Sequence, residues 1–248
     1  MISGKGNIVR RPADSPPGAA TRRTLLRGGA AAALGGALTV LASSPGQAAW
    51  PTFTLGSSGE HVSALQRLLG ERGYWCGTPD GHFGGLTQQA VYALQKSGGL
   101  TPDAVVGRQT LKALSAWVQP AVLDDGPGTR VVVQLERQVL TVLRDGVLQL
   151  TLNTSTGNGE PYDWYGRTYN ANTRPGDFEV FQTYSPGWQT GPLGRLYRPQ
   201  YFNGGIAVHG SEFIPPYPDS HGCCRVSVAA MDMLWEGTMD MGTPVRVV

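Results

Sequence analysis

Residues 205–225 read GIAVHGSEFIPPYPDSHGCCR and join two histidines and two adjacent cysteines through a proline-rich loop. The apolar start of this segment predicts a β-strand that ends at His209. We expect a loop beginning at Gly210 to expose the His209 ring. Because the prolines stiffen the residues that follow, we also expect this excursion to return the chain towards His209 at the second run, which begins at Ser220.

Cys223 is the candidate nucleophile of this segment. A thiol attacks a carbonyl only as its thiolate, and a free cysteine with a pKa of about 8.5 needs a cationic or hydrogen-bonding neighbour to ionise at neutral pH. His209 and His221 are the candidate neighbours, because both precede Cys223 within the same short segment. Gly222 permits a sharp or left-handed backbone, which would aim the Cys223 amide at an oxyanion beside the thiol.

Cys224 raises a separate question, because three cysteines are an odd number and at least one thiol must stay free or pair with another molecule. Adjacent side chains of an extended segment point to opposite faces, so we expect Cys224 to face the core as a small hydrophobic residue. A Cys223–Cys224 disulfide and a bridge to Cys76 are the alternatives. No metal site is predicted with His209 and His221, because neighbouring cysteines do not readily converge on one ion.

The chain from residue 130 to residue 248 predicts a β-rich domain, a sandwich-like mixed sheet. Its Val- and Leu-rich runs have the two-residue period of strands, and Asp145-Gly146 marks a hairpin turn. A helix capped by Ser227 is expected near the end of the chain. The expected strands cover residues 130–135, 138–143, 147–153 and 245–248, and the expected helix covers residues 228–236.

Residues 50–117 predict a small three-helix domain. Apolar residues such as Val62 and Leu69 recur at helical spacing, and Ser57 with Glu60 matches a capping box before them. The second and third helices are expected at residues 87–96 and 108–117. The fold class is therefore α+β with two domains, joined by a linker that is rich in Pro, Gly and Asp at residues 118–129.

Residues 1–49 have the pattern of an export signal. Arg22-Arg23 precede an apolar, Ala- and Gly-rich stretch, and small residues suit a signal peptidase that cleaves after Ala48 or Ala49. The paired arginines indicate the twin-arginine route of bacterial export, so we expect the mature protein outside the cell, at the wall. A retained anchor is the alternative, although the apolar stretch falls short of the ~20 residues that a spanning helix needs.

The charge of the chain argues against a nucleic-acid partner. There are 20 basic and 18 acidic residues, and the first 48 residues contain six of the basic ones but one of the acidic ones. The remaining 14 basic and 17 acidic residues include no basic run, so the electrostatic footprint of nucleic-acid binding is missing.

Both predicted domains resemble known families. The helical part resembles the peptidoglycan-binding domain in its motifs at residues 65–69, 80–84 and 105–111. The β-rich part resembles the catalytic domain of YkuD-type L,D-transpeptidases. His209-Gly210 at the end of an apolar strand, the run from Ser220 to Cys223 and then Arg225 match its signature, as do residues 173–178 and 242–245.

The second resemblance implies a role for each matching residue. Cys223 would be the nucleophile, and His209 the general base and later the acid, oriented by the backbone carbonyl of Gly210. His221 would be a further catalytic residue that also shapes the pocket, and Gly222 would form the turn of the oxyanion region. Ser220 and Arg225 would shape the substrate pocket. Among the loop aromatics, Tyr197 and Tyr201 are ranked first as substrate contacts, because they lead into the His209 strand.

The implied reaction is a two-step acyl transfer in peptidoglycan without metal or cofactor. Cys223 would take up the acyl group of a tetrapeptide stem as a thioester while the terminal D-Ala leaves. The side-chain amine of a diamino acid on a neighbouring stem would then attack this thioester and complete a 3→3 cross-link. Carbapenem-type β-lactams would be covalent inhibitors. The alternatives are an L,D-carboxypeptidase that transfers the same acyl group to water, and a wall-binding protein without activity.

Overall fold

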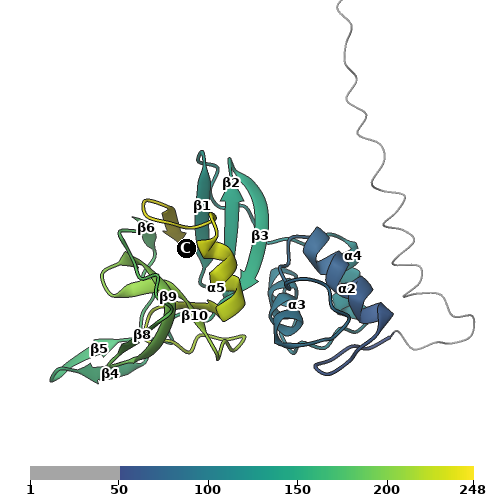
Figure 1. The fold of residues 1–248 in the computed structure, drawn as a ribbon, viewed down its shortest axis with the longest axis horizontal. Coiled ribbons are helices and arrows are strands. Elements are labelled where there is room, and N and C mark those ends of the chain that lie inside the picture. The colour runs from purple at the N-terminus through teal and green to yellow at the C-terminus, as the bar shows by residue number, and fades with distance from the viewer. Residues whose placement is uncertain (1–50) are drawn as a thin grey trace, which may run out of the picture.

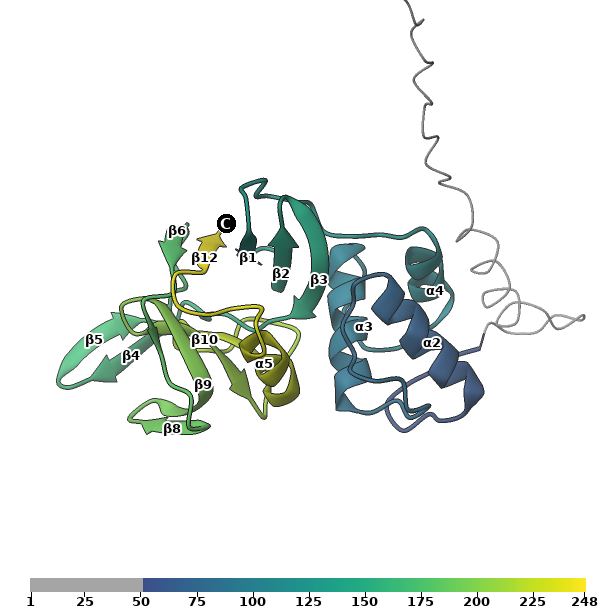
Figure 2. The same cartoon turned by 45° about the horizontal axis from the view of Figure 1, so that its top comes forward.

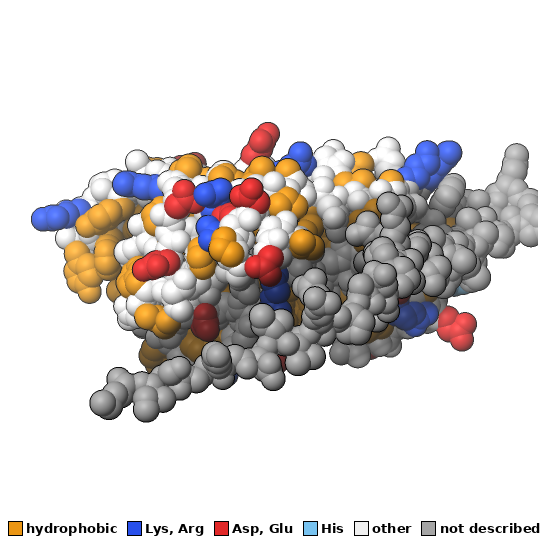
Figure 3. Space-filling view, turned by 90° about the horizontal axis from the view of Figure 1, so that it is seen from above, with side chains coloured by type: hydrophobic (Ala, Val, Ile, Leu, Met, Phe, Trp, Pro, Cys, Tyr) orange, Lys and Arg blue, Asp and Glu red, His pale blue; other side chains and the backbone are white. Residues whose placement is uncertain are grey.

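The computed structural model describes residues 51–248, and the predicted export signal lies outside these residues. The described chain forms a helical module (residues 51–118) that packs against a β domain (residues 129–248), as Figure 1 shows. None of the described helices combines the length and apolar character needed to cross a membrane. In the face drawn in Figure 3, acidic, basic and apolar side chains of the described residues are intermixed.

Three helices enclose the core of the helical module. Their apolar faces bury Leu65, Leu69, Leu94 and Leu114 around the ring of Phe83. This packing is the one that the helical spacing of the apolar residues predicts. The helices are α2 (Glu60–Glu71), α3 (Gly85–Ser97) and α4 (Arg108–Ser115).

Two buried glutamines fix the loops of this module. Gln66 on α2 accepts a hydrogen bond from the Asp80 amide at 3.0 Å and donates to the Asp80 carboxylate at 2.7 Å. Gln95 on α3 makes the matching pair of bonds, accepting from the Ala104 amide and donating to the Asp103 carboxylate. Each glutamine therefore satisfies polar groups of the loop that follows its own helix.

The predicted capping box before α2 is wrong. The hydroxyl of Ser57 accepts from the Thr54 amide at 3.0 Å, and the N-cap residue of α2 is Gly59, which has no side chain to offer. The Ser57 carbonyl also accepts from the Phe83 amide at 2.8 Å. A contact with the distant loop thus holds Ser57 away from the helix end, which short-range spacing could not reveal.

The β domain contains two five-stranded sheets and a two-stranded ribbon. The first sheet has the order β3-β2-β1-β12-β6, and the second has the order β11-β10-β9-β7 with β8 also paired to β9. The strands are β1 (Thr129–Gln134), β2 (Val139–Arg144), β3 (Val147–Asn153), β4 (Pro161–Trp164), β5 (Arg167–Asn170), β6 (Gly176–Glu179), β7 (Gln182–Thr183), β8 (Trp188–Gly191), β9 (Gly194–Asn203), β10 (Ile206–Ser211), β11 (Cys224–Ser227) and β12 (Pro244–Val247).

The two sheets bury one apolar core between them, with α5 (Val228–Trp235) packed on β9, β10 and β11. The hairpin turn at Asp145-Gly146 has left-handed φ values of 51° and 73°, as predicted. Ser227 caps α5 by accepting from the Ala230 amide, and β12 pairs in parallel with β1. Figure 2 shows that the β4–β5 ribbon projects from the β domain on the side away from the helical module.

Lys96 joins the helical module to the β domain. It is buried at the end of α3, and its ammonium donates to the carbonyls of Gln138 and Thr154 at 2.9 and 3.3 Å and to the side chain of Asn153. In return, Arg137 of the β domain donates to two carbonyls at the end of α3 at 3.2 Å each. Burial among neutral oxygens lowers the pKa of Lys96 to about 7.

Candidate active site

The two predicted catalytic runs lie on neighbouring strands. β10 and β11 pair in parallel, with His209 opposite Arg225 and Val208 opposite Cys224. Cys223 is the residue immediately before β11, so the pairing places it close to the row of His209. The proline-rich loop between the strands therefore returns the chain as predicted.

His209 lies within β10, and the prediction that a loop from Gly210 exposes it is wrong. Gly210 and Ser211 continue the strand by pairing with Val226 and Ser227, and the His209 side chain is only 5% exposed. A side chain added at Gly210 would approach Tyr197 to 3.0 Å, so the close packing of β9 on β10 requires glycine there.

The imidazole of His209 has a defined tautomer. Its Nδ1 lies 2.9 Å from the carbonyl oxygen of Gly210, and because a carbonyl can only accept, Nδ1 carries the hydrogen. Nε2 is then left as the proton acceptor. Burial, opposed by the bond to Gly210 and aided by the nearby Arg225 guanidinium, lowers the pKa of His209 to about 4. His209 is therefore a neutral base at neutral pH.

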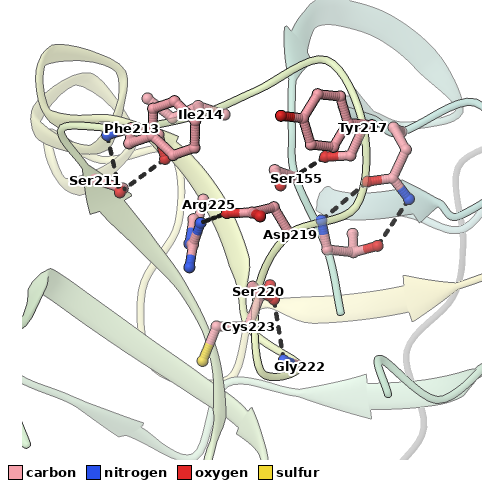
Figure 4. A network of polar contacts seen from close by, with 12 residues as sticks. Ser155, Ser211, Phe213, Ile214, Tyr217, Asp219, Ser220, Gly222, Cys223 and Arg225 are labelled. Carbon is pink, nitrogen blue, oxygen red and sulfur yellow. Dashed lines mark hydrogen bonds and ion pairs between the residues drawn. The ribbon is translucent and has the colours of Figure 1, made fainter. Parts of the chain in front are cut away.

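Gly222 bends the chain just before the cysteine, as predicted. Its φ of +130° is open to glycine only, and an added Cβ would lie 2.5 Å from Ile206 Cδ1. The Ser220 hydroxyl accepts from the Gly222 amide at 3.0 Å and donates to the Cys223 carbonyl at 2.6 Å. Figure 4 shows this turn with the Cys223 side chain beside it. Ser220 thus holds the backbone on both sides of the turn.

Thr173 supports the same turn from a different part of the chain. Its hydroxyl donates to the Gly222 carbonyl at 2.6 Å and accepts from the Gly157 amide at 2.9 Å. Thr173 belongs to a run that resembles the family, but its bond to the turn was not predicted, since it joins residues 49 positions apart.

Cys223 is partly exposed and carries a resting thiol. The sulfur lies 3.7 Å from the Gly205 carbonyl, to which it donates. Burial raises the pKa of the Cys223 thiol, while a backbone hydrogen bond with Ala207 and the charge of Arg225 act in the opposite direction. The site therefore holds a neutral thiol together with a neutral imidazole.

Cys224 faces the apolar core, as predicted from its place next to Cys223. Burial raises the pKa of its thiol strongly. Cys76 is buried in the separate core of the helical module, and all three cysteines are free in the structure. Within residues 51–248, no three His, Cys, Asp or Glu side chains are grouped so that they could hold a metal ion.

A cavity of about 610 Å³ opens over the site. His209 and Cys223 both line it, together with Ser220, His221 and Arg225. The exposed ring of His221 packs edge-on against Tyr162 of the β4–β5 ribbon, with 4.9 Å between ring centres. The ribbon thus forms one wall of the cavity, to which Trp164 also contributes.

Arg225 is held by an acidic partner that the sequence did not reveal. Its guanidinium pairs with the Asp219 carboxylate at 2.7 Å, as Figure 4 shows. Asp219 also lines the cavity, as does a second cation, Arg195, from β9. The cavity therefore contains two guanidinium groups, of which one is partly neutralised.

The two predicted tyrosines differ in position. Tyr201 lines the cavity, donates to the side chain of Gln189 at 2.6 Å, and has its pKa raised by burial and by the nearby Cys223. Tyr197 does not line the cavity, contrary to its ranking as a substrate contact. It donates to Asp232 on α5 at 2.9 Å. Alternation alone would put Tyr197 and Tyr201 on the same face of β9, but a bulge between Tyr197 and Gln200 turns Tyr197 to the other face.

Comparisons with known proteins agree with this architecture. A family model described as the L,D-transpeptidase catalytic domain matches residues 128–247, and a model of a peptidoglycan-binding domain matches residues 58–114. The crystal structure of an L,D-transpeptidase from Xylanimonas cellulosilytica is 45% identical, with a TM-score of 0.77, and the match covers 83% of this chain and 100% of that one. The chain belongs to the L,D-transpeptidase family.

Two further similarities are more limited. The structure of an L,D-transpeptidase from Stackebrandtia nassauensis is 24% identical over 83% of this chain and 97% of that one, with a TM-score of 0.47. The N-acetylmuramoyl-L-alanine amidase CwlM of Mycobacterium tuberculosis is 39% identical over 56 residues. This match covers 23% of the present chain but 14% of the amidase, so it concerns one short part of that protein.

Proposed function

We propose that this enzyme forms 3→3 cross-links in peptidoglycan through a thioester on Cys223. The observation that carries the proposal is that the Cys223 thiol and the His209 imidazole line one cavity, with Nε2 of His209 left free to accept a proton. Membership of the L,D-transpeptidase family supports the reaction class.

In the first step, Cys223 Sγ attacks the carbonyl between the third residue of a tetrapeptide stem and its terminal D-Ala. The thiol hydrogen turns from the Gly205 carbonyl to His209 Nε2, which takes the proton. The Cys223 amide, presented by the Gly222 turn, stabilises the oxyanion. The C–N bond then breaks, the imidazolium returns its proton to the leaving amine, and D-Ala departs from the thioester.

In the second step, the side-chain amine of a diamino acid on a neighbouring stem attacks the thioester carbonyl. His209 accepts a proton from this amine, the C–S bond breaks, and the sulfur recovers a proton as the thiol. Neutral His209 suits both steps, because only an unprotonated imidazole can act as the base. The products are the cross-linked peptide and the free enzyme.

The cations of the cavity suit a donor that carries carboxylates. Arg225 and Arg195 both line it, and guanidinium groups bind carboxylates in a fixed geometry. Ser220 and Gly210 act by holding Cys223 and His209 in place. His221 and Tyr201 contact the stem from the cavity walls.

The place of action follows from the substrate. Cross-linked peptidoglycan lies outside the cytoplasmic membrane, so we propose export through the twin-arginine signal predicted at residues 1–49. The helical module would then hold the enzyme on the wall, as its similarity to peptidoglycan-binding domains supports.

The test is to incubate the protein with a disaccharide tetrapeptide or with a carbapenem and to follow its mass. We expect an acyl adduct on the wild type and on Cys224→Ala, since Cys224 faces the core. Cys223→Ala should form none. An adduct on Cys223→Ala would show that Cys223 is not the nucleophile.

Analysis of the products separates transfer from hydrolysis. With tetrapeptide alone, a cross-linked dimer that lacks one D-Ala is the expected product. Release of D-Ala with a tripeptide as the only other product would instead make the enzyme an L,D-carboxypeptidase. If no adduct and no D-Ala release occur, the chain is a wall-binding protein.

A further inference from the structure

A second groove, of about 660 Å³, runs between the helical module and the β domain. One wall is α3, with Gln88, Gln89 and Tyr92, and the opposite wall is the loop between β10 and β11, with Phe213 and Tyr217. The start of α5 also lines the groove. Both parts of the protein therefore contribute to this groove.

The walls of the groove are held together by hydrogen bonds. The Gln89 amide donates to the carbonyl of Ile214 at 3.2 Å and its oxygen accepts from Asn153 at 2.6 Å. The Ser155 hydroxyl donates to the Tyr217 carbonyl at 2.8 Å, as Figure 4 shows. The groove is thus a formed feature of the described chain, since each wall is tied to the β domain.

The groove adjoins the catalytic cavity. Ser211 and Phe213 line both hollows, so the segment between β10 and the loop is their common border. The Phe213 side chain is 60% exposed there, and the Ser211 hydroxyl accepts from the Phe213 amide at 3.2 Å. A polymer that crosses this border from the groove would enter the cavity that Cys223 lines.

The two hollows differ in charge. The catalytic cavity has Arg195 and Arg225 in its walls, whereas the groove has no lysine or arginine among the described residues that line it and has one acid, Glu212. A stem peptide carries several carboxylates. The groove offers no cation to pair with them, and Glu212 would repel them. The groove therefore fits a neutral ligand.

The remaining lining is of amides, hydroxyls and aromatic rings. Tyr217 is 56% exposed. The pKa of Tyr92 is raised by burial, by Asp103 and by the nearby Tyr217, which indicates that the two tyrosines are neighbours. Aromatic faces are negative and attract the C–H groups of a sugar ring, while Gln88 can bond its hydroxyl and acetamido groups.

We propose that this groove binds the glycan strand of peptidoglycan, so that sugars lie between the two parts of the protein while the attached stem peptide enters the catalytic cavity. The inference rests on the proposed function for the identity of the polymer. It assigns Tyr92 and Tyr217 as the sugar-stacking residues and gives the helical module a direct part in substrate positioning.

The first test is binding of a neutral probe, the β-1,4 hexamer of N-acetylglucosamine, to the full chain by calorimetry. The double variant Tyr92→Ala/Tyr217→Ala should bind about tenfold more weakly or worse, a change worth about 1.4 kcal/mol. The matched control is Phe181→Ala, an exposed aromatic residue outside both hollows, which should bind as the wild type does.

The second test compares D-Ala release from a free tetrapeptide and from the same stem on a glycan chain. The double variant should keep the wild-type kcat/KM on the free peptide and lose about tenfold on the glycan-linked stem. Equal losses on both substrates would show that the groove binds the peptide and would overturn the proposal. A wild type that does not bind the hexamer would also overturn it.

Two readouts keep the outcomes separate. Amide chemical shifts of the wild type upon addition of the hexamer should change around residues 88–92 and 213–217, which needs no variant, and shifts confined to other regions would also overturn the proposal. A wild type that binds the hexamer but releases no D-Ala from any tetrapeptide would reject the proposed function while leaving the sugar site in place.

Discussion

His209 lies opposite Arg225 in the parallel pairing of β10 and β11, so a buried base and a guanidinium share one row of the sheet. The cation disfavours a second positive charge on the imidazole, in the same direction as burial. The pairing of the strands thus helps to keep His209 neutral, and the predictions for the pH dependence of the reaction follow from it.

The first prediction is an acid limb of kcat/KM near pH 4. The His209 pKa is lowered from 6.5 to about 4, so the neutral base is present above that value and is lost as the pH falls through it. Burial raises the pKa of the Cys223 thiol, so the alkaline limb, where the thiol proton that His209 passes to the leaving amine is lost, should lie above the ordinary range of a cysteine. D-Ala release measured across this range checks both limbs, and an acid limb at 6.5 would contradict the assignment.

Replacement of His209 by Ala should reduce the rate of acylation by about 10²- to 10⁴-fold, the usual contribution of a general base. The variant should remain folded, because His209 lines the cavity, and the space that its ring leaves is open to that cavity. Time-resolved mass spectrometry gives the rate and thermal melting gives the stability. Normal acylation by a folded variant would assign the base to another group, with His221→Ala as the matched comparison.

Gly222→Ala should destabilise the protein by about 3 kcal/mol, because alanine resists a φ of +130° and its Cβ would lie 3.0 Å from the backbone oxygen of Asn172, while the end of the Ile206 side chain would have to move. Acylation should be lost in the same variant, since the turn presents Cys223. The control is Gly166→Ala, where φ is +70° and no atom lies within 4 Å of the added Cβ, so that about 1–2 kcal/mol is expected with activity kept. Urea unfolding measures the free energy of unfolding of both variants. Equal losses would show that the contacts around Gly222 add nothing to the backbone strain.

Lys96→Met should lower the free energy of unfolding by about 1–3 kcal/mol, because the buried acceptors on Gln138, Asn153 and Thr154 lose their donor. Lys112→Met, at an exposed position of α4, should change it by less than about 0.5 kcal/mol. Chemical denaturation of both variants provides the comparison. Similar small effects would show that the Lys96 bonds contribute little to the interface.

Lys96 should also make stability depend on pH. Its pKa falls from 10.5 in the unfolded chain to about 7 in the folded one, so the unfolded state binds more protons between these values. Stability contributed by this residue therefore rises as the pH increases from about 7 towards 10.5. The free energy of unfolding of Lys96→Met, measured against pH, should lack this part of the rise, and an unchanged slope would refute the shift.

Local features of this fold could be predicted from the sequence. The β1–β2–β3 meander, the turn at Asp145-Gly146 and the cap at Ser227 depend on residues a few positions apart, and all three are present. The outward-facing Cys223 and the core-facing Cys224 likewise follow from alternation along an extended segment.

Features that depend on distant partners could not be predicted. Ser57 is held by the amide of Phe83 in a distant loop, and His209 is buried because β10 continues past it to pair with β11. Tyr197 turns to α5, since the face of a strand after a bulge is set by its neighbours. The bond from Thr173 to the Gly222 turn spans 49 positions. In each case, pairing and packing across the fold decide the outcome.

The opposite orientations of the two adjacent cysteines have a consequence for oxidative damage. An oxidant that enters the cavity meets the Cys223 sulfur, whereas Cys224 is buried in the apolar core and Cys76 in that of the helical module. A sulfenic acid on Cys223 would have no resolving thiol within the chain, so it would proceed to irreversible sulfinic acid unless an external thiol intercepted it. The nucleophile thus depends on the reductants of its surroundings for repair.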